Sequence, residues 1–314
     1  MKLLLIGLGR WGKNHLKALG KLASELYAVD SDPGQLKACE SFSIPKDHLS
    51  TDYHDFLDRV DGVDIVTPAD NHLAICKDCF ERGKDVFVEK PIALTSAEAK
   101  KMIAQSKERG LILQVGHIFR FNNALKMMRD LIELDYFGNL YYLKLQWTTL
   151  APSPLNRDII FDLGPHPVDI MNYVLKKWPS KVTCKARAYR RKMLEELAYF
   201  MIEFDDDLLA QVELSWLQPG KVRRLDVIGS ERSATVDCLE QSIGIYENGD
   251  GDTHSLQVIR NNTIFDEVQH FADSILTAEN SDNPGNVGAK NVAVLESLKR
   301  SLEENRTVKV DLRD

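Results

Sequence analysis

The chain has 314 residues, of which 44% are hydrophobic and 28% charged, and its formal net charge is -7 at pH 7. This length favours two domains, and the composition is typical of a soluble globular protein. A negative net charge disfavours a nucleic-acid surface, which needs clustered lysines and arginines. The first apolar run ends at Ile6, too soon for a secretory signal, and no stretch approaches the roughly 20 apolar residues that span a bilayer. We therefore expect a cytoplasmic protein with no nucleic-acid or membrane partner.

The five cysteines are scattered and odd in number. This pattern indicates reduced thiols rather than a disulfide framework. Cys76 and Cys79 form a lone C-x-x-C in a segment that reads as helix, with no second Cys or His pair at zinc spacing. We therefore expect no metal site.

The first 120 residues alternate short apolar runs with helical patterns. Predicted strands lie at 3–6, 26–29, 63–66, 86–88 and 111–115, and 97–108 has helical periodicity. Continuous apolar strands between helices predict a doubly wound parallel sheet, a Rossmann domain, covered on both faces. Ligands of such sheets bind at the carboxyl ends of the strands.

After residue 121 the pattern changes. A helix is predicted at 123–134, a strand at 140–149 and a helix at 165–176, with a loop at 151–158 between the last two. Successive strands follow at 182–189, 197–204, 208–216, 222–228 and 242–246, before a last helix at 287–304. Strands in succession predict a large, mostly antiparallel sheet in an α+β domain. The predicted domains are 1–120 for cofactor and 121–314 for substrate binding and oligomerisation.

A glycine motif follows the first strand, in the order Gly7-Leu8-Gly9-Arg10-Trp11-Gly12. The three glycines suit a tight turn, close approach of a pyrophosphate, and packing of helix on strand. A plain strand–turn–helix is the alternative. Asp30 closes the second strand 18 residues after Gly12. A carboxylate there can accept hydrogen bonds from a ribose diol and would repel a 2′-phosphate, which favours NAD over NADP.

Glu89-Lys90-Pro91 ends the fourth strand, where a nicotinamide would lie. A lysine there can hydrogen-bond a substrate hydroxyl, although a lone lysine after a strand is more often a surface residue.

Asp162 and His166 are four residues apart, and Pro165 and Pro167 flank His166. Two prolines so close are tolerated only in the first turn of a helix, so His166 is predicted at a helix start with Asp162 just outside it. A histidine oriented by a carboxylate suits a general base. Spacing alone favours the plainer alternative, a helix-terminal histidine and a capping aspartate. Asp169, one turn on, fits helix-terminal electrostatics.

Together these motifs resemble the glucose–fructose oxidoreductase / inositol dehydrogenase (Gfo/Idh/MocA) family over nearly the whole chain. The order and spacing of the glycine motif, Thr67-Pro68 with Asn71-His72, Glu89-Lys90-Pro91, and Asp162-x-Gly164-x-His166-x-x-Asp169 carry the resemblance. It implies a Rossmann domain and a second domain whose open sheet commonly builds homodimers or homotetramers. It also implies hydride exchange between a sugar carbon and NAD(P).

The resemblance also implies roles for individual residues. Lys90, Asp162 and His166 become the catalytic set, with His166 as general acid/base. Thr67, Pro68, His72 and Glu89 would line the cofactor.

Within the family, residues 115–122 resemble the branch that oxidises nucleotide-sugar hydroxyls. His117, Arg120 and Arg157 are therefore candidate substrate-binding residues, the arginines for an anionic group. Arg120 could equally pair within the protein. The leading hypothesis is an NAD-dependent dehydrogenase acting on a sugar or nucleotide sugar. A redox-neutral, glycosidase-like enzyme that uses NAD transiently and a non-catalytic NAD-binding sensor are the alternatives.

Overall fold

The structure, a computed structural model, describes residues 1–42, 44–152, 157–247, 253–279 and 281–312. The chain forms two compact units. Unit 1 consists of Met1–Ile118 and Asn262–Val292, and unit 2 of Phe119–Asn261 and Ala293–Asp314. The predicted domain boundary at residue 120 lies within two residues of the point where the chain first passes from unit 1 to unit 2. The prediction of one uninterrupted second domain is wrong, because a distant segment returns to unit 1.

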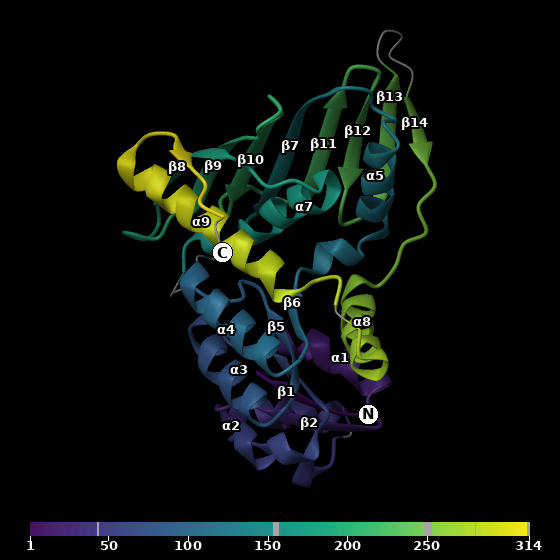
Figure 1. Cartoon of the computed structure of the whole chain (residues 1–314), viewed down its shortest axis with the longest axis vertical. Coiled ribbons are helices and arrows are strands. Elements are labelled where there is room, and N and C mark those ends of the chain that lie inside the picture. Colours follow the sequence, from purple (N-terminus) through teal and green to yellow (C-terminus); the bar gives the residue numbers. More distant parts are fainter. Residues whose placement is uncertain (43, 153–156, 248–252, 280, 313–314) are drawn as a thin grey trace. The chain divides into compact units, whose positions relative to one another are not determined.

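Unit 1 is built on a parallel sheet that contains six strands within the described residues (Figure 1). Its strands, in spatial order, are β3 (Leu49–Ser50), β2 (Glu25–Val29), β1 (Lys2–Ile6), β4 (Gly62–Ile65), β5 (Asp85–Glu89) and β6 (Leu113–Gly116). Its helices are α1 (Gly12–Leu22), α2 (Pro33–Lys37), α3 (His72–Glu81), α4 (Ser96–Glu108) and α8 (Thr263–Thr277). The strand order reverses between β1 and β4, which is where doubly wound sheets bind ligands.

Helix α8 is the element that sequence analysis did not assign to unit 1. Its Val268 and Phe271 are fully buried in one core with Leu5 of β1 and Leu19 of α1. Gly62 of β4 is also close, since a Cβ there would lie 3.3 Å from the Phe271 ring. This packing explains why a segment from beyond residue 260 belongs to unit 1.

Unit 2 is built on a sheet with nine strands in the part of the chain described. Their spatial order is β14 (Thr253–Leu256), β13 (Ser242–Glu247), β12 (Arg232–Asp237), β11 (Lys221–Gly229), β7 (Leu140–Thr149), β10 (Leu209–Ser215), β9 (Leu197–Glu203), β8 (Lys181–Arg187) and β15 (Val308–Lys309). Its helices are α5 (Asn123–Glu133), α6 (Ile159–Leu163), α7 (Pro165–Leu175) and the later part of α9 (Gly285–Glu304). Among these strand pairs only β7 and β10 run parallel, which confirms the predicted mostly antiparallel sheet.

The two faces of this second sheet differ in character. The inner face carries buried side chains such as Leu145, Trp147 and Phe200, which join the core formed with α5, α6 and α7. The outer face is exposed and mixes polar residues with large apolar ones, including Tyr142 and Tyr199. Period-2 alternation of the strands separates these two sets.

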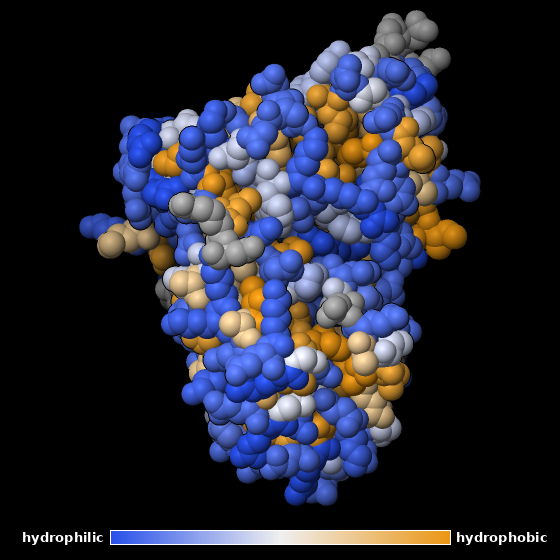
Figure 2. Space-filling view, viewed as in Figure 1, coloured by the Kyte–Doolittle hydropathy of each residue, from blue (hydrophilic) through white to orange (hydrophobic). Residues whose placement is uncertain are grey.

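None of the helices in the described ranges is both long and apolar enough for a transmembrane segment. The face shown in Figure 2 is largely hydrophilic, with hydrophobic side chains gathered in separate patches.

Candidate active site

The glycine motif forms the turn between β1 and α1. Gly7 has a φ of +100°, and a Cβ there would lie 2.5 Å from the carbonyl oxygen of Val66. A Cβ on Gly12 would lie 2.0 Å from the carbonyl oxygen of Gly7. At Gly9, by contrast, a Cβ would meet no atom of the described residues within 4 Å. The first and third glycines therefore serve packing, while the second leaves the backbone open to a ligand.

Asp30 follows β2 and is tied to this turn. Its Oδ2 accepts the N–H of Leu8 at 2.7 Å, and its Oδ1 accepts the N–H of Asp32 at 2.9 Å. Each oxygen keeps acceptor capacity for a ligand hydroxyl. The open backbone at Gly9, the start of α1 and the Asp30 carboxylate suit the phosphates and ribose of a dinucleotide.

Glu89, the last residue of β5, joins the glycine turn to Lys90. Its Oε1 accepts the indole N–H of Trp11 at 2.8 Å, and its Oε2 accepts the backbone N–H of Lys90 at 3.0 Å. The carboxylate is also why residue 116 is glycine, since a Cβ there would lie 2.8 Å from Oε1. Glu89 therefore fixes the backbone from which the Lys90 side chain projects.

Beneath Glu89 lies a buried histidine that sequence analysis missed. His15 of α1 places Nε2 3.2 Å from Glu89 Oε1 and Nδ1 2.8 Å from Oδ2 of Asp64 in β4. Burial alone would lower the pKa of His15, but the two carboxylates raise it well above its usual range. Burial likewise opposes ionisation of Glu89, yet the hydrogen bond and charge of His15 hold the pKa of Glu89 below its usual value. The imidazolium is thus shared by two buried carboxylates.

Thr67 and Pro68 follow β4 at the reversal of strand order, and both are partly exposed there. His72 is different, since its side chain is 1% exposed and its ring nitrogens lie 3.0 Å from the Thr67 carbonyl and 3.1 Å from the Pro91 carbonyl. That His72 lines the cofactor stays a prediction. Its ring supports the two turns that carry Thr67 and Lys90.

In unit 2, Asp162 and His166 lie at the junction of two helices. Asp162 is in α6, which Asp158 caps through the backbone N–H groups of Ile160 and Phe161. His166 is the second residue of α7, which begins with Pro165 as predicted. Both side chains are half-buried. The His166 ring packs edge-on to Phe119 at 5.2 Å, and Arg157 Nε lies 3.3 Å from Asp162 Oδ1.

The predicted substrate arginines have different surroundings. Arg120 donates from Nε to Asp169 at 2.8 Å and from Nη2 to Asn172 at 2.7 Å, and its side chain is only 11% exposed. The alternative that Arg120 pairs within the protein is therefore what the structure shows. Arg157 is 45% exposed beside Asp162. His117 is buried at the end of β6. Substrate contacts by these three residues stay predictions, and residues 153–156 of the predicted 151–158 loop lie outside the described residues.

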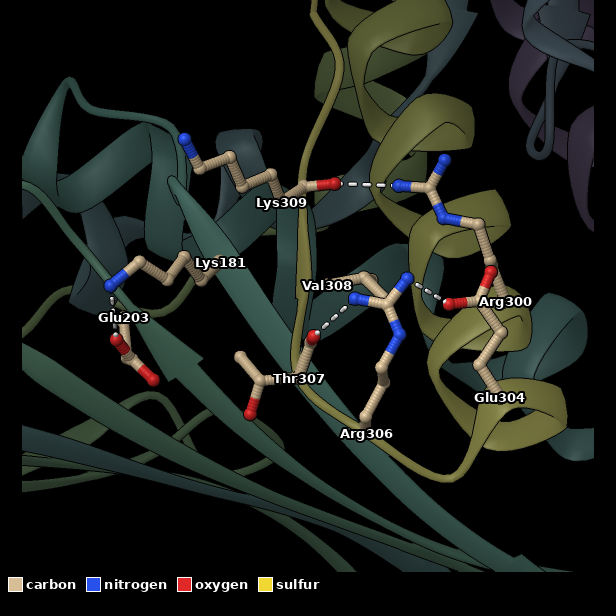
Figure 3. A pocket seen from close by; sticks show the side chains of 8 residues that line it. All are labelled: Lys181, Glu203, Arg300, Glu304, Arg306, Thr307, Val308 and Lys309. Atoms are coloured by element: carbon tan, nitrogen blue, oxygen red, sulfur yellow. Dashed lines mark hydrogen bonds and ion pairs between the residues drawn. The ribbon is translucent and has the colours of Figure 1, made fainter.

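A pocket elsewhere in unit 2 has no predicted catalytic residue. It lies between the end of α9 and the β8–β15 edge, and Figure 3 shows its lining: Lys181, Glu203, Arg300, Glu304, Arg306, Thr307, Val308 and Lys309. Lys181 pairs with Glu203, Arg306 pairs with Glu304, and Arg300 donates to the Lys309 carbonyl. Three of its four cationic side chains, those of Lys181, Arg300 and Arg306, are thus engaged within the protein.

The sequence did contain a signal for the buried network. Asp64 stands in an otherwise apolar central strand, where a charged residue is rarely buried without a partner. Its partner, His15, lies three residues after Gly12. No group of His, Cys, Asp and Glu within the described ranges could hold a metal ion.

Comparison with known proteins matches both units to one family. Residues 1–117 match the model described as the GFO_IDH_MocA oxidoreductase family with an NAD-binding Rossmann fold, and residues 125–235 match the GFO/IDH/MocA C-terminal domain.

Three similar proteins illustrate the match. The UDP-N-acetylglucosamine 3-dehydrogenase of Acidithiobacillus ferrooxidans is 26% identical over 261 residues, covering 83% of this chain and 81% of the relative. The scyllo-inositol 2-dehydrogenase (NAD(+)) of Bacillus subtilis is 29% identical over 293 residues, covering 86% and 85%. A solved structure of the A. ferrooxidans dehydrogenase superposes with a TM-score of 0.87 at 22% identity, covering 97% of this chain and 98% of that one.

Proposed function

The chain belongs to the GFO/IDH/MocA family of NAD-dependent oxidoreductases, and from that membership we propose that it oxidises a secondary hydroxyl of a sugar or nucleotide sugar. NAD is the cofactor, and it supplies the acceptor for the hydride. The observation that carries the proposal is the glycine turn of unit 1, in which the backbone at Gly9 is open to a ligand and the Asp30 carboxylate accepts the N–H of the adjoining Leu8.

Three residues would carry the proton chemistry. His166 accepts the proton of the reacting hydroxyl, since an imidazole has a pKa near neutral pH and can act as base in one direction and acid in the other. Asp162 stabilises the positive charge that His166 gains. Lys90 donates a hydrogen bond to the reacting oxygen, which favours its negative character as the proton leaves.

The substrate class rests on the relatives. UDP-N-acetylglucosamine and inositol are the substrates named for two of them, and both are polyhydroxylated rings oxidised at a secondary carbon. The test is NADH formation by the purified protein with NAD and, separately, neutral sugars, inositols, sugar acids and UDP-sugars. Turnover of at least one, lost in His166→Asn, supports the proposal. A protein that binds NAD but turns over none of these substrates contradicts it.

The outer face of the unit 2 sheet supports a homodimer or homotetramer. Tyr142, Tyr199, Met201 and Leu209 form an outer-face patch on β7, β9 and β10, and each is between 42% and 47% exposed. The register pairs Leu209 with Tyr142, so these side chains share one face. Contiguous exposed apolar residues of this kind mark interfaces.

The oligomer is tested by light scattering on the double variant Tyr199→Glu and Met201→Glu. We expect the wild-type mass of a dimer or tetramer and a monomer for the variant. Leu134→Glu, at an exposed position after α5, is the matched control. A monomeric wild-type protein would contradict the proposal.

A cytoplasmic location is part of the same proposal. All five cysteines are free and buried, and burial raises the pKa of Cys76 well above its usual value. Such thiols serve packing and resist oxidation, as in proteins of reducing compartments.

A further inference from the structure

Arg223 is a buried cation on the inner face of the unit 2 sheet. It lies on β11 opposite Trp147 of β7 and is 8% exposed. Its Nη1 donates to the carbonyl oxygens of Thr148 at 3.0 Å and Val222 at 2.7 Å, and its guanidinium stands over the Trp147 ring at 5.7 Å. In the described part of the chain no carboxylate is within ion-pair distance of Arg223.

A buried guanidinium without a bonded carboxylate is unfavourable by itself. Burial lowers the pKa of Arg223 to about 10, although the charge of Asp162 partly opposes that shift. Carbonyl oxygens and an aromatic face compensate only part of the lost hydration of a full charge. Binding of an anion beside the Arg223 guanidinium would therefore stabilise the folded protein.

The geometry leaves one edge of the guanidinium for that anion. Both hydrogen bonds to the described residues use Nη1. The Nε and Nη2 groups make none with those residues. Nε and Nη2 together form the planar fork that binds a carboxylate or phosphate through two parallel hydrogen bonds.

The surroundings of Arg223 connect it to the predicted catalytic pair within unit 2. Its guanidinium contacts Trp147, the Trp147 ring packs edge-on to Phe119 at 5.2 Å, and Phe119 packs edge-on to His166. The charge of Asp162 also raises the pKa of Arg223, so Arg223 lies within electrostatic reach of the second predicted catalytic residue of unit 2.

We propose that Arg223 binds an oxyanion, a carboxylate or a phosphate, carried by the substrate close to the carbon that is oxidised. This inference rests on the proposed function and narrows its substrate class from sugars in general to sugars with an acidic substituent. Arg157 is not required for this anion site, because its guanidinium already has a carboxylate neighbour. Its Nε lies 3.3 Å from Asp162 Oδ1.

The test compares Arg223→Gln and Arg223→Lys with the wild-type enzyme and with Arg224→Gln. Arg224 is the matched control, since it is the next residue on β11, points to the opposite face and pairs with Asp226. Substrates are neutral hexoses, the corresponding uronic acids, hexose phosphates and UDP-sugars with and without a uronate. The readouts are KM and kcat for each, together with NAD affinity.

We expect wild type to favour an acidic substrate. Arg223→Gln should lose about 10- to 100-fold in kcat/KM on that substrate, mostly through KM, because it loses a bidentate charge-assisted interaction. Arg223→Lys should recover part of the loss, and Arg224→Gln and NAD affinity should stay as in wild type. Preference for a uronate or for a phosphate identifies which oxyanion is bound. An equal loss on neutral and acidic substrates, or a wild-type preference for neutral sugars, would overturn the inference.

A binding measurement separates this inference from the proposed function. Calorimetric titration of glucuronate, and separately of glucose 6-phosphate, into the NAD-loaded protein needs no turnover. Binding of at least one that is weakened in Arg223→Gln but not in Arg224→Gln supports the anion site even if no sugar is oxidised. Binding of neither probe, or equal binding to both variants, overturns it.

Discussion

The Nε2 atom of His15 lies 3.2 Å from Oε1 of Glu89, so a buried imidazole of α1 is in direct contact with the carboxylate that precedes Lys90. Through this contact the helix that follows the glycine turn and the strand that precedes Lys90 are linked in one buried network. Asp64 completes it from β4.

His15→Gln should destabilise unit 1 by about 3 kcal/mol, because the two buried carboxylates lose their shared cation. The folded-state pKa of His15 is raised above its unfolded value, so its contribution is fully present below about pH 6.5 and is lost as pH rises through the folded pKa. The difference in unfolding free energy between wild type and variant should therefore be larger at pH 6 than at pH 9. Urea denaturation at both values measures it, and a difference that grows with pH would contradict the assignment.

Gly9→Ala should leave folding intact and abolish NAD binding. The added methyl group meets no described atom within 4 Å, but it occupies the space in which a pyrophosphate would approach the backbone. Thermal unfolding and calorimetric titration with NAD measure the two effects separately. Gly20→Ala, at an exposed position inside α1, is the control and should raise stability by about 0.5–1 kcal/mol without changing NAD affinity. Unchanged NAD affinity in Gly9→Ala would contradict the role of the glycine turn.

Asp30→Asn should weaken the preference for NAD over NADP by about tenfold, since the amide no longer repels a 2′-phosphate. The variant keeps one side-chain oxygen for the hydrogen bond from Leu8. The ratio of the two dissociation constants is the readout. Asp32→Asn removes a negative charge two residues further along the same loop and is the control for a general charge effect on the NAD/NADP preference. If Asp32→Asn changes that preference as much as Asp30→Asn does, a specific contact between Asp30 and the ribose is contradicted.

Lys90→Met should lower kcat by about 10²- to 10⁴-fold with NAD affinity unchanged, because it removes the donor to the reacting oxygen and not a cofactor ligand of the glycine turn. Lys107→Met, on the exposed surface of α4, is the control. Loss of NAD binding with kcat preserved would show that Lys90 serves the cofactor alone.

Strands β1, β2 and β5 of unit 1 were predictable because each contains an uninterrupted apolar run that stops at a polar or glycine residue, as at Ile6-Gly7 and Val29-Asp30. Strand β12 (Arg232–Asp237) was not predictable, since Ala234 and Val236 are its only apolar residues, and it is held in the sheet by pairing with β11 and β13. The return of α8 to unit 1 depends on tertiary packing of Phe271, which no local pattern records.

In the candidate site, too, some features follow from local sequence and others depend on tertiary contacts. The glycine turn and the helix start at Pro165 follow from local chemistry, because backbone conformation is dictated by glycine and proline. The contacts of His15 with Asp64 and Glu89 join residues 49 and 74 positions apart, and Arg120 is neutralised by Asp169 across 49 positions. Spacing along the chain cannot determine such pairs, and it likewise does not reveal that the His72 ring is buried between the turns that carry Thr67 and Pro91.

The central claim is that His166 is the proton acceptor in an NAD-dependent oxidation of a sugar hydroxyl. The direct measurement is single-turnover NADH formation by wild type and His166→Asn at saturating NAD with the best substrate of the panel, over pH 6 to 10. We expect the wild-type rate to rise with pH as the general base loses its proton, and the variant to be slower by about 10²- to 10⁴-fold and to lack that rise. A variant with the wild-type rate and pH profile would contradict the claim.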